Sequence, residues 1–191
     1  MFITKIALDE FMALPVHTRA KVIRTIDQYD TNLACSPFIQ LRDNLIGIYT
    51  EVSSVQRIIF FYRTDAGTNI LGILLRKNKK LMLTEQDEIL RRADKPQEQD
   101  VSKRWSSVRQ IALGEPEVKT AFENEVLKEM LQTTLLQWRS AAGLTREQLA
   151  EKMGVSFKHI CNIEINPSKI SIHTIYQYAR FCGINNPAII L

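Results

Sequence analysis

Residues 145–164 read Thr-Arg-Glu-Gln-Leu-Ala-Glu-Lys-Met-Gly-Val-Ser-Phe-Lys-His-Ile-Cys-Asn-Ile-Glu, and this is the most informative stretch of the chain. Apolar residues recur at helical spacing on both sides of Gly154, and Thr145 and Ser156 stand where caps begin helices. Gly154 can take the positive φ that a tight turn between helices demands. The pattern predicts a helix-turn-helix, whose second helix presents its early residues to the DNA major groove. A plain helical hairpin in a bundle is the simpler alternative.

The second helix of this pattern presents polar and basic side chains on its outward face. An Asn amide can pair with adenine, a Lys or His can reach guanine, and Phe157 can touch a thymine methyl group. The predicted DNA-binding residues are Arg146, Gln148, Ser156, Phe157, Lys158, His159, Asn162 and Lys169. Residues 138–182 hold six basic and three acidic side chains, a net charge of +3 that favours phosphate binding. For each residue alone, a solvated surface side chain is the simpler alternative.

The composition is that of a globular chain with room for one large or two small domains. It has 191 residues, of which 45% are hydrophobic, and a net charge of +4. Its three cysteines are odd in number and far apart, which fits neither a disulfide framework nor a zinc site, so we expect a reducing cytoplasm and no metal. No apolar run approaches the roughly 18 residues of a membrane span. We expect no membrane partner and no cofactor.

Residues 1–94 combine helical and strand patterns. Ile3–Ala7 reads as a short first strand, residues 8–30 as two helices that break at Pro15, and Glu85–Ala93 as a closing helix. Between them lie three β-rich runs, Gly47–Val52, Arg57–Arg63 and Asn69–Leu75, which are separated by turn-forming residues. We therefore expect an α+β N-terminal domain, in which flanking helices pack on a small antiparallel sheet.

A polar segment with one proline follows and reads as a linker. We expect a first domain at 1–94, the linker at 95–101 and an all-α second domain at 102–191, with the helix-turn-helix at about 131–183. Within the second domain, Glu115–Ala142 carries a sustained helical stripe and Ser171–Cys182 forms the last helix. The stripe is longer than a helix-turn-helix unit needs for its own core. We expect it to contact the first domain or a second chain; packing of the whole helix within the second domain is the simpler alternative.

Cations gather on the predicted strands of the first domain, where no catalytic triad, metal-ligand cluster or glycine-rich phosphate loop occurs. Arg57 and Arg63 share a face because they are six residues apart at period two, while Tyr62 faces away from both. Further basic residues follow the next strand, namely Arg76, Lys77, Lys79 and Lys80. Clustered cations can bind an RNA backbone and stabilise a phosphorane transition state. An ordinary basic strand end is the simpler alternative, and His17 is expected on the surface.

Five motifs occur in order in the first domain: Leu41–Leu45, Gly47–Tyr49, Gln56–Phe61, Ile70–Lys77 and Glu88–Ala93. In this order they resemble the RelE/HigB-like toxins of bacterial toxin–antitoxin pairs, in particular the phage-derived branch. The resemblance implies a RelE-like fold and metal-independent cleavage of messenger RNA on the ribosome. It assigns the catalytic role to Arg57 and to the basic run Arg76, Lys77, Lys79 and Lys80.

Three further motifs, Ser102–Trp105, Glu115–Phe122 and Leu144–Ala150, resemble the matching HigA-like antitoxin with an Xre-type helix-turn-helix. Together the two resemblances imply a fused toxin–antitoxin protein, with the toxin first. Its ribonuclease domain would be held inhibited by a DNA-binding domain that autoregulates transcription. The implied partners are operator DNA, ribosome-bound messenger RNA and a second copy of the chain in a homodimer.

A transcriptional regulator with a catalytically degenerate toxin-like domain is the alternative interpretation. The family often has a His shortly before its basic pair, whereas this chain reads Gly72-Ile73-Leu74-Leu75 there. No Tyr or His follows the closing helix, so a general acid is not evident. In the alternative, the first domain serves dimerisation or partner binding. An unrelated sensor domain joined to a helix-turn-helix is a third interpretation.

Overall fold

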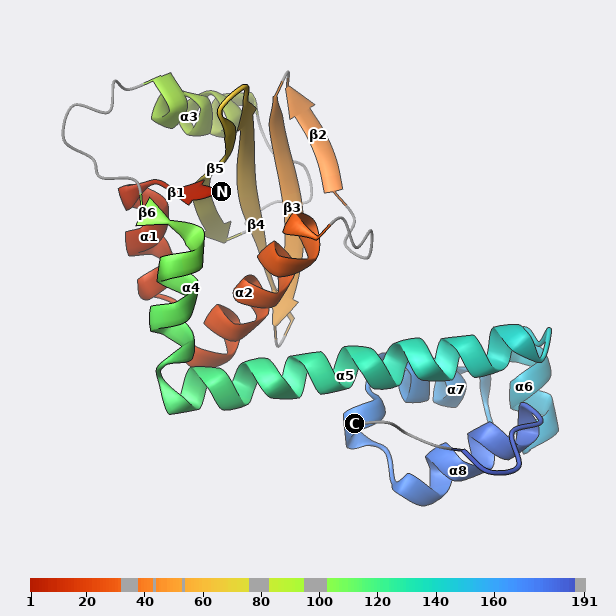
Figure 1. Cartoon of the computed structure of the whole chain (residues 1–191). Helices are drawn as coiled ribbons and strands as arrows, with labels where there is room; N and C mark the ends of the chain where they lie inside the picture. The colour runs from red at the N-terminus through yellow and green to blue at the C-terminus, as the bar shows by residue number, and fades with distance from the viewer. Residues whose placement is uncertain (32–37, 43, 53, 76–82, 95–102, 188–191) are drawn as a thin grey trace. The chain divides into compact units, whose positions relative to one another are not determined.

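The computed structural model describes residues 1–31, 38–42, 44–52, 54–75, 83–94 and 103–187 (Figure 1). The chain divides into two compact units, Met1–Phe122 and Glu123–Leu191. The division falls well after the segment expected to be a linker, because residues 103–122 fold with the first unit. The expected linker itself, residues 95–101, lies outside the described residues.

The first unit begins with a very short strand and two helices. Strand β1 is only Phe2–Ile3, because the Thr4 hydroxyl accepts a hydrogen bond from the Ala7 N–H at 3.3 Å and so begins helix α1, Lys5–Met12. The prediction of a strand over Ile3–Ala7 was therefore wrong beyond Ile3. Helix α2, Val16–Asp30, starts directly after Pro15, as the sequence predicts.

Six strands form one sheet in the order β2-β3-β4-β5-β1-β6. Strands β2 (Phe38–Arg42), β3 (Leu45–Val52), β4 (Val55–Thr64) and β5 (Gly67–Leu75) form an antiparallel meander. Strand β1 pairs in parallel with β5, and β6 (Lys103–Arg104) pairs antiparallel with β1. The sheet is thus mixed at one edge, whereas the sequence predicted an antiparallel sheet. Strands β1 and β6 have two residues each and lie far apart in the sequence, so neither shows the alternating pattern that predicts a strand.

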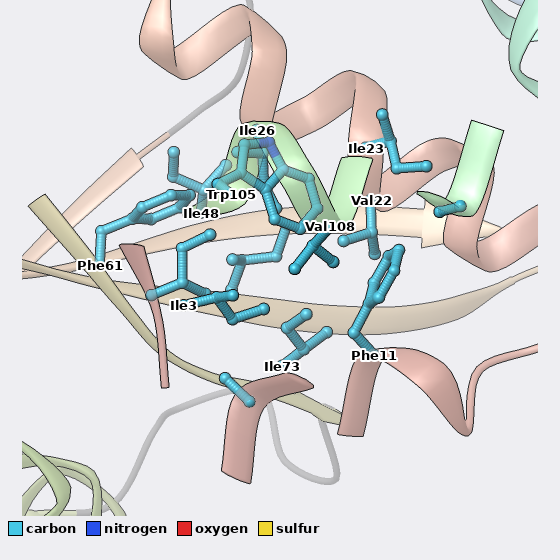
Figure 2. Close-up of a cluster of buried hydrophobic side chains, with 14 of the residues drawn as sticks. Ile3, Phe11, Val22, Ile23, Ile26, Ile48, Phe61, Ile73, Trp105 and Val108 are labelled. Atoms are coloured by element: carbon cyan, nitrogen blue, oxygen red, sulfur yellow. The ribbon is translucent and has the colours of Figure 1, made fainter. Parts of the chain in front are cut away.

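Side chains alternate between the two faces of β4. Ile59 and Phe61 enter the larger core, which α1, α2 and α4 (Trp105–Leu113) cover, while Ile58 and Phe60 enter a smaller one. Helix α3, Leu83–Asp94, covers that second face through Ile89, which confirms the predicted closing helix. Figure 2 shows the larger core, with side chains from the sheet and from helices on both sides of the expected linker.

Residues 103–122 are an integral part of the first unit. Trp105, Val108, Ala112 and Val118 are all buried in the larger core. The Trp105 ring packs edge-on against Phe11 of α1, with ring centroids 5.5 Å apart and an interplanar angle of 77°. Strand β6 continues the sheet by pairing Lys103 with Ile3. The segment that resembles the start of an antitoxin is therefore packed as core, not as a loose tail.

Two ion pairs fix the same segment at its surface. Arg109 of α4 binds Asp27 of α2 at 2.8 Å. Arg19 of α2 binds both carboxylate oxygens of Glu115, at 2.7 and 2.9 Å. Planar, two-contact pairing of this kind fixes orientation as well as adding electrostatic energy.

The second unit is all helical. It consists of the later part of α5 (Pro116–Ala141), then α6 (Arg146–Met153), α7 (Phe157–Ile165), the 3₁₀ turn η1 (Pro167–Lys169) and α8 (Ile172–Phe181). Its hydrophobic core consists of Leu135, Leu149, Ala150, Ile160, Ile163, Ile175, Tyr178 and Cys182. The helices predicted around Gly154 and over residues 171–182 are confirmed. Within the described residues, no helix is long and apolar enough to cross a membrane.

Candidate nucleic-acid interface

The turn between α6 and α7 has the geometry that the sequence predicts. The Thr145 hydroxyl accepts from the Gln148 N–H at 3.2 Å, and the Gln148 side chain accepts from the Thr145 N–H at 2.8 Å, which is a reciprocal capping box. Gly154 ends α6 with φ at 66°. Ser156 caps α7 by accepting from the His159 N–H at 3.2 Å. These caps fix where α7 begins and which side chains its first turn presents.

The first turns of α7 present an exposed polar surface with one aromatic ring. Lys158 and Asn162 are four residues apart, so they lie one above the other on the helix face opposite the buried Ile160 and Ile163. Six of the eight predicted DNA-binding residues are exposed in α7, at its cap or in the turn after it: Ser156, Phe157, Lys158, His159, Asn162 and Lys169. The Asn162 side-chain oxygen accepts from the Asn166 side chain at 3.3 Å, and this bond positions the amide at the surface.

The other two predicted residues, Arg146 and Gln148, have structural partners. The Gln148 side-chain oxygen is used in the capping box, although the residue is exposed. The Arg146 Nε donates to Glu164 at 2.6 Å, while its side chain is still 40% exposed. Both residues therefore shape the domain.

Glu164 is the centre of a buried polar cluster that the sequence analysis missed. Its side chain is only 1% exposed and accepts from Arg139 at 2.6 Å, from Arg146 at 2.6 Å and from the Tyr178 hydroxyl at 2.7 Å. Arg139 also donates to the Leu144 carbonyl at 3.0 Å. The cluster thus joins α5, α6, α7 and α8 around one carboxylate.

The protonation states of the cluster follow from these contacts. Burial by itself raises the pKa of Glu164, but the hydrogen bonds from Arg139, Tyr178 and Arg146 outweigh it and hold the pKa below its usual value. Burial, together with the hydrogen bond to Glu164, raises the pKa of Tyr178 well above its usual value. The carboxylate is therefore charged and the phenol neutral across the physiological range.

A signal for this cluster is present in the sequence. Glu164 directly follows Ile163 and lies four residues after Ile160, so it falls on the buried stripe of α7. A carboxylate at such a position needs cationic partners, because an unpaired buried charge is very costly. The pairing also changes the surface charge of residues 138–182, since Arg139 and Arg146 offset Glu164 internally. The remaining basic residues there are all exposed: Lys152, Lys158, Lys169 and Arg180.

Residues 135–185 match the family model described as Helix-turn-helix. This part of the chain is similar to helix-turn-helix domains. The match covers the end of α5 and all of α6, α7, η1 and α8, and it supports a DNA-binding transcriptional regulator. Among curated proteins and solved structures, none matches the chain.

In the first unit, the structure describes only one of the predicted catalytic residues. Arg57 is half-buried on β4, where it pairs with Thr50 of β3 and Leu75 of β5. The other four, Arg76, Lys77, Lys79 and Lys80, lie outside the described residues. Because Leu75 is the last residue of β5, the basic run follows in sequence directly after the strand partner of Arg57.

The neighbours of Arg57 confirm the predicted alternation. Arg63 shares its face of β4 and donates from Nε to the Tyr29 hydroxyl on α2 at 3.0 Å. Tyr62 packs with the smaller core on the opposite face, so it does not join the arginines. His17 is exposed on α2, as expected. Arg57 therefore lies on the sheet face that α1, α2 and α4 cover.

Proposed function

We propose that the chain is a fused toxin–antitoxin protein, in which the helix-turn-helix binds operator DNA and the antitoxin-like segment restrains a toxin-like ribonuclease. The observation that carries the proposal is the burial of Trp105, Val108 and Ala112 in the core of the first unit. These residues belong to the segment that resembles an antitoxin, and they pack on the sheet face that also carries Arg57. The segment that resembles an antitoxin is thus part of the first folded unit.

The contacts of this segment suit an inhibitor that is always present. Three contacts hold the segment. Strand β6 pairs with β1, Trp105 packs against Phe11, and Arg109 forms an ion pair with Asp27. A tethered segment meets its target at an effective concentration near the millimolar range. It therefore remains bound under conditions in which a separate antitoxin would dissociate.

The proposed chemistry is electrostatic. Arg57, with the basic run Arg76, Lys77, Lys79 and Lys80, would hold the scissile phosphate and stabilise the charge that develops as the RNA 2′-oxygen attacks. No metal is part of the proposal. Its substrate is messenger RNA on the ribosome, as the resemblance to RelE/HigB-like toxins implies.

The DNA-binding part of the proposal is autoregulation by a homodimer. Dimeric helix-turn-helix proteins place two recognition helices about 34 Å apart, one turn of DNA, on an inverted repeat. Lys158, His159 and Asn162 would contact bases, while Lys169 and the exposed part of Arg146 would contact phosphates. Ser156 and Gln148 would position the two helices and add backbone contacts.

A regulator with a catalytically degenerate first domain is a second candidate, and one observation favours it. Residues 103–118 contribute to the same core as Ile3, Phe11 and Phe61, so removing them would expose the apolar surface of this core. A segment so deeply integrated suits a permanent scaffold better than a removable inhibitor. In this case the first unit would serve dimerisation or partner binding.

Expression of fragments in growing bacteria separates the two candidates. Residues 1–122 retain the segment and should be soluble and harmless, whereas residues 1–94 should arrest growth and cleave ribosome-bound messenger RNA. Co-expression of residues 95–191 should restore growth, and Arg57→Ala in the 1–94 fragment should abolish the arrest. If the 1–94 fragment is soluble and folded by circular dichroism, yet neither slows growth nor cleaves RNA, the degenerate regulator takes the place of the fused toxin–antitoxin protein.

A further inference from the structure

Phe157 is an exposed aromatic side chain at the start of the recognition helix. It is the first residue of α7, directly after the Ser156 cap, and it is 48% exposed. It does not belong to the core that the described residues of the second unit form. Its neighbours at the surface, Ser156, Lys158 and His159, are all polar. The ring therefore interrupts a polar surface without contributing to the buried core.

The position of Phe157 directs its ring beyond the end of the helix. The Cα–Cβ bonds of an α-helix tilt towards its N-terminus, so a side chain in the first turn extends past the helix end. The Ser156 hydroxyl is already hydrogen-bonded to the His159 N–H, which leaves the cap satisfied and the backbone fixed. In a helix-turn-helix, it is this end of the second helix that meets base edges.

The major groove offers an aromatic ring one apolar partner. Its floor consists of hydrogen-bond donors and acceptors, apart from the C5 methyl group of thymine. We propose that Phe157 is a specificity-determining residue, which selects thymine at one position of each half-site by burying its C5 methyl group. The proposal rests on the proposed role of α7 in reading operator DNA, and it adds a base that the polar residues of α7 do not read.

The experiment starts with selection of a binding site from a pool of random duplexes by the full-length chain. Each thymine of the selected duplex is then replaced singly by deoxyuridine, which removes only the methyl group. At one thymine per half-site, the wild-type chain should bind the deoxyuridine duplex about fourfold more weakly, the change expected for one buried methyl-sized group. Phe157→Ala should weaken binding to the thymine duplex by a similar factor and bind both duplexes equally.

Two variants serve as controls. Phe157→Leu keeps an apolar side chain and should retain part of the preference for thymine. Phe181→Ala removes a ring of similar exposure, 42%, at the end of α8, and should retain the full preference. Unchanged thermal midpoints would show that the variants are folded, as expected for residues outside the core.

Four results would overturn the inference. If the wild-type chain binds every deoxyuridine duplex as tightly as the thymine duplex, it makes no contact with a thymine methyl group. If the Phe157→Ala variant loses as much affinity as wild type when thymine is replaced by deoxyuridine, another residue makes the methyl contact. If the Phe157→Ala variant has a lower oligomeric mass but the same base preference as wild type, the ring contacts a second copy of the chain and not DNA. A full-length chain that enriches no sequence at all would overturn the operator-binding proposal as well.

Discussion

The ring of Trp105 packs edge-on against the ring of Phe11, with centroids 5.5 Å apart. These residues lie on either side of the expected linker, one at the start of α4 and one in α1. Their contact makes the segment after the linker part of the N-terminal core. It also places a tryptophan in the first unit, while the chain's other tryptophan, Trp138, packs against the core of the second. Each unit therefore carries its own fluorescent reporter.

Trp105→Ala should destabilise the first unit by about 3–5 kcal/mol, the usual cost of removing a large buried ring. Trp105→Phe should cost much less, because the indole N–H has no hydrogen-bond partner among the described residues and none is lost. Ile111→Ala, at a 64% exposed position on the same helix, should change stability by less than about 0.5 kcal/mol. Urea denaturation followed by circular dichroism measures all three. Equal stability of the Trp105→Ala and Ile111→Ala variants would contradict the packing described.

Glu164→Gln should destabilise the second unit by about 3–5 kcal/mol, because it leaves buried guanidinium groups without their counter-ion. In a Trp105→Phe background, Trp138 is the sole tryptophan, so its fluorescence follows the second unit alone. Glu151→Gln, an exposed change on α6, is the matched control and should leave the urea midpoint in place. A midpoint for Glu164→Gln equal to that of this control would show that the cluster adds no stability.

The same cluster should make the second unit sensitive to acid. The pKa of Glu164 is lower in the folded state than in the unfolded state, where it is about 4.3. Its contribution to stability is therefore present above about pH 4.3 and lost as the pH falls through the folded-state value. Urea midpoints between pH 3 and 7 should fall more steeply for wild type than for Glu164→Gln. Parallel curves would exclude Glu164 as the group responsible.

At alkaline pH the phenol of Tyr178 should limit stability. Its pKa is raised in the folded state, so its contribution is present below the unfolded value of about 10 and is lost as the pH rises above it. Burial likewise raises the pKa of the Cys182 thiol to about 11. Tyr178→Phe should lower stability at pH 7 by about 1.5–3 kcal/mol, because the hydrogen bond to Glu164 is lost. Above pH 10, the stability of this variant should decline less steeply than that of wild type. Tyr176→Phe, on the same helix but 43% exposed, should show neither effect.

The exposed polar residues of the second unit should divide into base and phosphate contacts. Asn162→Ala should cost about 1–3 kcal/mol on the selected operator and relax the preference at one base position. Lys169→Ala should weaken binding to all sequences alike and reduce the salt dependence by about one unit of slope. Titrations of specific and random duplexes at several salt concentrations measure both. An Asn162→Ala variant with unchanged sequence preference would remove this residue from the base contacts.

Local signals predicted much of the second unit. Thr145, Gly154 and Ser156 act through neighbouring backbone groups, so their roles can be read within a few residues. The Glu164 cluster was missed because its partners, Arg139 and Tyr178, come from other helices, and no local pattern brings them together. The same reason applies to the docking of residues 103–122. Strands β1 and β6 have two residues each and lie about a hundred residues apart in sequence, so their pairing depends on the folded core.

If residues 103–122 restrain a catalytic site that contains Arg57, as we propose, loosening this segment in the full-length chain should release RNA cleavage. Arg109→Ala with Glu115→Ala removes the Arg109–Asp27 and Arg19–Glu115 ion pairs and leaves the buried side chains of the segment unchanged. Gln110→Ala with Glu117→Ala changes two exposed residues, one next to Arg109 in α4 and one just after Glu115 in α5, and is the matched control.

The measurement is growth together with cleavage of ribosome-bound messenger RNA after induction of each full-length variant. The Arg109/Glu115 variant should slow growth and cleave RNA, the control variant should do neither, and adding Arg57→Ala should reduce cleavage by about 10²–10³-fold. Protease sensitivity shows whether the variant has released the segment. If the segment is released and growth and RNA are still unaffected, residues 103–122 do not restrain a catalytic site.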